Sequence, residues 1–201
     1  MSYPSGIVVV LVILFGVSGT GYLVRAFAGH PSLKARISDL LHVLMAGAMI
    51  TMALDANTLF PPIAQLIVFG SAIIYYAILA IVDPSATDTH ALHGGRALLS
   101  YHAFMMAAMV VMATQMLQAG THLDGSMDMD VPITHPMTMA SDPGWGATVI
   151  VAAVLFAAAA ILFAVRLFVP VSTRSSSAAD RVNSILLLGM SAGMCLAFIP
   201  W

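Results

Sequence analysis

The stretch FPPIAQLIVFGSAIIYYAILAIV, residues 60–82, decides the fold, because it contains no Asp, Glu, Lys or Arg over its whole length. A helix that crosses the hydrocarbon core of a bilayer needs about 20 predominantly apolar residues. A helix buried in the core of a soluble domain is usually shorter and carries a polar face. We therefore interpret this stretch as a transmembrane helix.

Five further stretches have the same character. They are residues 4–25, 37–56, 97–118, 145–168 and 182–200. The chain of 201 residues is 60% hydrophobic and 8% charged, whereas soluble domains carry about 25% charged residues. The sequence therefore predicts an all-α integral membrane bundle, with residues 1–201 forming a single domain of six transmembrane helices. The first stretch lacks a preceding basic residue and a small-residue cleavage site, so we expect a retained helix.

The basic residues predict how the bundle is oriented. All seven Lys and Arg residues lie in, or beside, alternate connections: Arg25, Lys34, Arg36, Arg96, Arg166, Arg174 and Arg181. Because Lys and Arg mark the cytoplasmic side, both termini are expected outside the cytoplasm (N-out, C-out). Trp145 and Trp201 then fall at the outer interface, which agrees. The basic residues form no patch, so no nucleic-acid partner is expected.

Two of the predicted helices carry the same spacing of histidine and methionine. The residues are His42, Met45, Met49 and Met52 in the first, and His102, Met105, Met109 and Met112 in the second. At about 100° per residue each set falls on one helix face. Both helices run outward, so the two histidines are expected at equal depth. We call these two sets the stripes.

The side chains of the stripes are typical ligands of copper. Imidazole suits several transition metals, whereas the soft thioether selects copper, mainly Cu(I). A histidine inside a membrane-spanning segment is costly and indicates function. If the stripes face each other, they form a column of copper ligands. The alternative is that the methionines only fill space between helices.

Small residues mark where helices are expected to approach closely. They include Gly16, Gly19 and Gly21 in the first stretch, and Ala46 to Ala48 in the second. This pattern predicts a compact bundle without identifying a partner.

The connection 119–144 is expected to be a long extracytoplasmic loop rich in Met, His and Asp. Its candidate metal ligands are His122, Met127, Met129, His135, Met137 and Met139. In a polar segment, packing does not easily explain methionine. The mixture of soft and borderline ligands suits copper capture. The alternative is a loop whose methionines fold back over the mouth of the bundle.

The motifs His42-Val-Leu-Met45 and His102-Ala-Phe-Met105, together with the six-helix layout, resemble a family of actinobacterial multi-pass membrane proteins of unknown function. The outer loop is similar in composition to copper-handling membrane proteins. This resemblance implies that the protein lies in the inner (cytoplasmic) membrane of a bacterium. It also implies that other membrane subunits of a copper enzyme, such as a copper-dependent hydrocarbon monooxygenase, are natural partners, alongside membrane lipid. It is an analogy at the level of the family.

Three functions follow as hypotheses. The first is a copper-binding membrane protein without catalysis of its own, which serves as an accessory or copper-loading subunit of a membrane oxidoreductase or takes part in copper uptake. The second is a haem-b electron carrier with His42 and His102 as axial ligands. The third is a purely structural membrane subunit. No nucleophile–base, phosphate-loop or HExxH motif points to catalysis by the chain alone.

Overall fold

The computed structural model describes residues 4–28, 32–56, 58–82, 95–124, 143–168 and 178–199. These residues form six α-helices and contain no strand: α1 (Ser5–Ala28), α2 (Leu33–Ala53), α3 (Pro62–Val82), α4 (Gly95–Asp124), α5 (Pro143–Phe168) and α6 (Ala178–Phe198). All six are long and apolar enough to cross a membrane. The prediction of an all-α fold with six candidate membrane spans is confirmed.

Local chemistry sets the ends of α2 and α3. Helix α2 begins at Leu33, earlier than the expected residue 37, because the Ser32 hydroxyl caps it and accepts a hydrogen bond from the Ala35 amide at 3.4 Å. The turn after α2 contains Asp55 with a φ of 54°, a left-handed conformation that Asp tolerates better than most residues. Pro62 then opens α3, at a position where its missing N–H costs nothing.

Helix α4 is longer than the sequence predicted. It spans 30 residues, Gly95–Asp124, so residues 119–124 belong to the helix and not to the outer loop. These residues include one glycine and no proline, and the helix continues until the residue before Gly125. At a rise of about 1.5 Å per residue, α4 is about 45 Å long and exceeds the about 30 Å hydrocarbon core. A helix of this length would have to tilt in, or project from, a membrane that it crossed.

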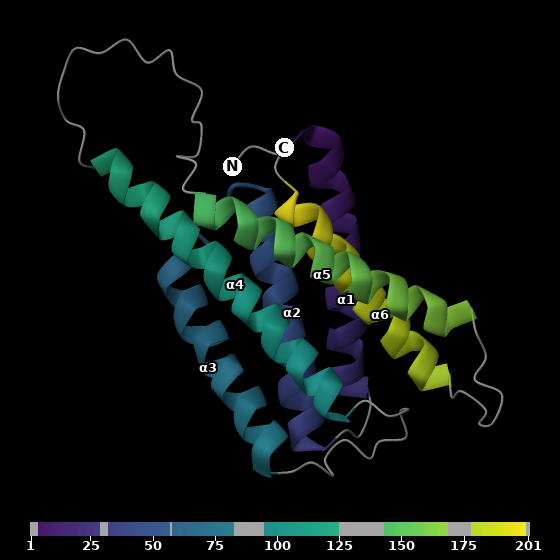
Figure 1. The fold of residues 1–201 in the computed structure, drawn as a ribbon. Coiled ribbons are helices and arrows are strands. Elements are labelled where there is room, and N and C mark those ends of the chain that lie inside the picture. The colour runs from purple at the N-terminus through teal and green to yellow at the C-terminus, as the bar shows by residue number, and fades with distance from the viewer. Residues whose placement is uncertain are drawn as a thin grey trace, which may run out of the picture.

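The bundle is built from helical hairpins. Helix α1 packs along α2, α3 along α4, and α5 along α6, and α1 also packs along α6. In Figure 1, α2 lies between α1 and the α3–α4 hairpin, and the start of α1 and the end of α6 are at the same end of the bundle. The backbones of α2 and α4 approach each other less closely than those of the hairpin partners.

Glycine permits a close approach of α1 to α2, as the sequence predicted for α1. A Cβ atom added to Gly19 would lie 2.9 Å from the Ala46 Cβ atom of α2, so only hydrogen fits there. Gly16 and Gly47 have nothing within 4 Å of such an atom. The expectation that these two glycines mark helix contacts within the bundle is therefore wrong, because both face away from the neighbouring helices.

The outer surface of the bundle is apolar. Large aliphatic side chains are exposed on several helices, including Val17, Ile67, Ile81 and Ile161, at 63%, 68%, 78% and 64%. A water-soluble monomer rarely exposes so much contiguous apolar surface. This exterior is suited to contact with lipid.

Candidate functional site

His42 presents an unpaired ring nitrogen to the interior of the bundle. It lies on α2 and its side chain is buried, with only 1% exposed. Its Nδ1 atom lies 2.7 Å from the carbonyl oxygen of Ser38, one turn earlier. A carbonyl only accepts, so Nδ1 carries the proton and Nε2 carries a lone pair. Among the described residues, Nε2 has no hydrogen-bond partner, a state that costs about 1–3 kcal/mol for a buried polar atom.

His102 of α4 meets His42 directly. The two ring centroids are 4.7 Å apart with the ring planes at 77°, an edge-to-face contact. His102 is half-buried. The two stripes therefore do face each other at their histidine ends, as their equal expected depth suggested. The contact passes through side chains, which explains why the α2 and α4 backbones stay apart.

Tyrosines surround the histidine pair. The Tyr22 ring of α1 stacks on His42, with centroids 4.5 Å apart. The rings of Tyr76 and Tyr101 lie 5.4 Å and 6.2 Å from His102. The Tyr22 hydroxyl is also buried and has no partner among the described residues. These tyrosines were not identified from the sequence. Each lies within two helical turns of the end of its helix that is nearest the histidine pair.

Two of the tyrosine hydroxyls are held by neighbouring helices. The Tyr76 hydroxyl lies 2.9 Å from the Ser38 hydroxyl, and Ser38 is the residue whose carbonyl oxygen binds His42. The Tyr101 hydroxyl bonds the Ser191 hydroxyl of α6, which in turn donates to the Leu187 carbonyl oxygen at 2.6 Å. These bonds fix the walls around the histidine pair.

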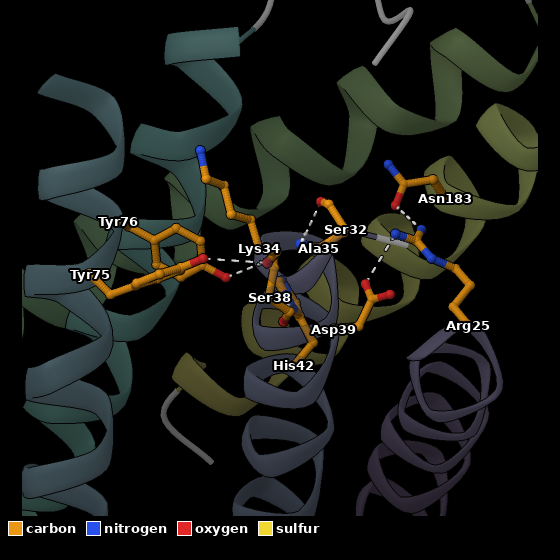
Figure 2. A network of polar contacts seen from close by, with 10 residues as sticks. All are labelled: Arg25, Ser32, Lys34, Ala35, Ser38, Asp39, His42, Tyr75, Tyr76 and Asn183. Atoms are coloured by element: carbon orange, nitrogen blue, oxygen red, sulfur yellow. Dashed lines mark hydrogen bonds and ion pairs between the residues drawn. The ribbon is translucent and has the colours of Figure 1, made fainter. Parts of the chain in front are cut away.

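An ion pair lies at the same end of the bundle as the histidine pair. Arg25 of α1 binds the Asp39 carboxylate of α2 at 3.0 Å and the Asn183 side-chain oxygen of α6 at 2.6 Å. Figure 2 shows Arg25 between these two residues, with Asp39 one turn from His42. The Asp39 side chain is 4% exposed, whereas that of Arg25 is 38% exposed. From the sequence, Arg25 was interpreted only as a marker of orientation, and Asp39 was not identified as a candidate.

The methionines of both stripes belong to one apolar core. Met45, Met105 and Met109 are fully buried, and Met49 is 3% exposed. Met52 and Met112 are half-buried and pack against the same core. This core also contains methionines outside the stripes, namely Met106, Met190 and Met194. The stripes therefore point inward along their whole length, which suits both packing and ligation.

Residues 34–200 match the sequence model of a family described as a domain of unknown function, DUF5134. The chain belongs to this family. No match was found among curated proteins or solved structures.

The DUF5134 match covers both histidines and every helix from α2 onward, apart from the first residue of α2. Helix α1, with Tyr22 and Arg25, precedes the matched range. The family description names no function.

The distance between the two histidine rings is compatible with one small ion shared by both. Two imidazoles that share one tetrahedral ion, with nitrogen–metal distances of about 2.0 Å, have ring centroids about 5 Å apart, close to the 4.7 Å found here. A haem bound by both histidines would need its porphyrin between the rings, which are in direct contact. The described residues contain no group of three His, Cys, Asp or Glu that fits a metal. Further ligands from this part of the DUF5134 chain would therefore be thioethers or other atoms.

The side chains of the candidate ligands in the predicted outer loop are outside the part of the chain that the structure describes. His122 falls in the last turn of α4, and its side chain is outside the described part of the chain. Met127, Met129, His135, Met137 and Met139 are outside the described residues. Their role in copper capture stays a prediction.

Proposed function

We propose that this protein is a multi-pass protein of a bacterial cytoplasmic membrane that binds Cu(I) between His42 and His102. The observation that carries the proposal is the Nε2 atom of His42, which is buried and has no hydrogen-bond partner among the described residues. Its ring lies 4.7 Å from that of His102, centroid to centroid. A buried lone pair held in this way is suited to bind a metal ion. Met45 and Met105, one turn further along each helix and fully buried, are the nearest thioethers in sequence and would favour Cu(I) over harder cations.

The hydrogen bond from His42 to Ser38 supports the same role. Metal-binding histidines usually donate their second ring N–H to a carbonyl or carboxylate, which fixes the tautomer and the ring orientation. The Ser38 carbonyl oxygen supplies this acceptor. Tyr76 holds the Ser38 side chain, so the ligand face of His42 is set before an ion arrives.

The protein does not catalyse a reaction on its own under this proposal. With N-out, C-out orientation, the Met/His/Asp-rich loop would capture copper outside the cytoplasm and the stripes would hold it or pass it inward. The recipient would be a membrane copper enzyme, for which the chain acts as an accessory subunit, or the cell itself in copper uptake. The charge pattern of the connections supports this orientation.

The test is the copper content and Cu(I) affinity of the purified protein. The protein from copper-supplemented cells is expected to hold copper by elemental analysis, with nitrogen and sulfur ligands in its X-ray absorption spectrum. The double variant His42→Ala/His102→Ala should lose this copper, and Met45→Leu should weaken its binding. Met194→Leu is the matched control, because Met194 is equally buried. It lies near the C-terminal end of α6, whereas Asn183, which binds Arg25 of the ion pair, lies near the N-terminal end. Wild-type protein without copper would overturn the proposal.

A structural role is the second candidate, because every described stripe methionine also packs in the apolar core. In that case the double histidine variant would leave the activity of any copper enzyme complex unchanged. The loop is tested separately by replacing Met127, Met129, Met137 and Met139 with Ser. We expect slower copper loading with unchanged final occupancy.

A further inference from the structure

The proposed copper site between His42 and His102 has only neutral ligands. An imidazole that binds through a lone pair carries no charge, and neither does a thioether. Cu(I) held by these groups would therefore keep its full positive charge. A charge buried in the interior of a protein is costly unless an opposite charge lies close to it. A copper site at this place therefore needs a carboxylate nearby.

Asp39 is the only acidic residue within the six candidate membrane spans. These spans are Ser5–Ala28, Leu33–Ala53, Pro62–Val82, Leu98–Gln118, Gly146–Val165 and Arg181–Phe198. Asp39 lies on α2 three residues before His42, and side chains at this spacing are neighbours on one helix face. Its side chain is 4% exposed. The single carboxylate of the spans is thus buried next to the ring that offers the lone pair.

Arg25 holds this carboxylate and also lies close to the histidine pair. It binds Asp39 at 3.0 Å, and its guanidinium carbon lies 5.6 Å from the centroid of the Tyr22 ring. That ring stacks on His42 with centroids 4.5 Å apart. Figure 2 shows Asp39 on the side of α2 that faces Arg25, with His42 one turn away. A cation at His42 would therefore be repelled by Arg25 and would compete with it for one carboxylate.

We propose that Asp39 is the counterion of the bound copper and that Arg25 is the competing cation, which holds Asp39 before an ion binds. This inference rests on the proposed copper site and adds two residues that set its affinity. A carboxylate is a hard ligand, which suits Cu(I) less well than thioether or imidazole. Asp39 therefore acts through its charge and not as a ligand. Its partner changes from Arg25 to the ion when copper binds.

The test is the Kd for Cu(I) of variants that remove one charge at a time, measured by chelator competition on the purified full chain. Asp39→Asn should raise the Kd about tenfold, because the ion loses its counterion while the Arg25 charge remains. Arg25→Gln should lower the Kd about threefold, since it frees Asp39 and removes a repelling charge that solvent partly screens. A purely structural role of the ion pair would weaken binding in both variants.

Asp55→Asn and Asn183→Ala are the matched controls. Asp55→Asn removes an equal charge beyond the other end of α2, more than about 20 Å from Asp39 along the helix axis. Asn tolerates the left-handed backbone of this residue. Asn183→Ala removes the second partner of Arg25 without a change in charge. Both variants should keep the Kd for Cu(I) within about twofold of wild type.

Stability measured with and without Cu(I) covers the case in which Arg25→Gln folds poorly. Bound Cu(I) supplies the missing cation to Asp39, so it should raise the Tm of Arg25→Gln more than that of wild type, and the Tm of Asp39→Asn less. A Kd that rises in both variants, or equals that of wild type in both, would overturn this inference and leave the copper site standing. Wild-type protein that binds no Cu(I) would overturn the proposed function and the inference with it.

Discussion

Helix α2 has two very different neighbours. Towards α1 it packs backbone against backbone, with Gly19 against Ala46 leaving room only for hydrogen. Towards α4 it makes contact through long side chains, above all His42 against His102. We call the first the glycine interface and the second the histidine–methionine seam.

The two interfaces of α2 differ in what we expect them to contribute: the glycine interface contributes stability, and the histidine–methionine seam contributes ligand binding. Membrane helices gain association energy from close van der Waals packing of small residues, and the glycine interface uses this device. In the seam the backbones are not closely packed, and the His42 Nε2 atom is buried with no hydrogen-bond partner in the part of the chain that the structure describes. Such a cost is typical of a functional site. We therefore expect substitutions in the seam to change ligand binding, and substitutions around α1 to change stability.

The largest effect is expected from His42→Phe in the seam. Phenylalanine keeps an aromatic ring against Tyr22 but has no ligand atom, so the Kd for Cu(I), measured by competition with a chelator, should rise at least about 100-fold. Stability in detergent should be unchanged or slightly higher, because a buried atom without a partner is removed. Loss of folding with intact copper affinity in the residual folded fraction would contradict the comparison.

The second prediction concerns the ion pair between Arg25 of α1 and Asp39 of α2. Arg25→Gln leaves the buried Asp39 carboxylate without its cation. Loss of one partner of a fully buried pair costs about 3–5 kcal/mol. Arg25 is 38% exposed, so solvent reduces this cost to about 2 kcal/mol of unfolding free energy. The double variant Arg25→Gln/Asp39→Asn should recover part of the loss, and an additive result in this double-mutant cycle would exclude coupling.

The third prediction places a methyl group between α1 and α6. In Gly193→Ala the added Cβ would lie 2.7 Å from the Phe15 ring, so Phe15 must move within a packed core. We expect the unfolding free energy to fall by about 1.5 kcal/mol. Gly47→Ala is the control, because its Cβ meets nothing within 4 Å. Equal stability of the two variants would show that the contact is not tight.

The smallest effect is expected from Tyr76→Phe. It removes the hydroxyl that holds Ser38 and should cost about 1 kcal/mol of stability. Because His42 keeps its bond to the Ser38 carbonyl oxygen, the Kd for Cu(I) should rise less than in His42→Phe. Tyr75→Phe removes a hydroxyl that bonds elsewhere and serves as the comparison.

Much of the fold could be predicted from hydropathy. Long apolar runs such as 60–82 leave a helix as the only way to satisfy the backbone in lipid, so the number and type of elements follow. Ends were less predictable, since the Ser32 cap and the continuation of α4 past residue 118 depend on single residues. The inward direction of the stripes also followed from helical period, for example in Met45 and Met105.

The surroundings of the histidines were not predictable in the same way. The stack of Tyr22 on His42 and the Arg25–Asp39 pair join different helices. Sequence periodicity describes one helix at a time and carries no information on which helices meet. One feature of the sequence could have indicated the ion pair. Asp39 is the single acidic residue of α2, and an acidic residue in a membrane span needs a partner.

The hydrogen bond between His42 and Ser38 lies within one helix, and this has a consequence for biogenesis. Its donor and acceptor are present as soon as α2 is wound, before later segments leave the ribosome. His102 arrives only with α4, so the second half of the pair is completed by assembly of the α3–α4 hairpin. A cation that binds both rings would then fasten that hairpin to the rest of the protein, and copper supply would govern how fast newly made chains mature.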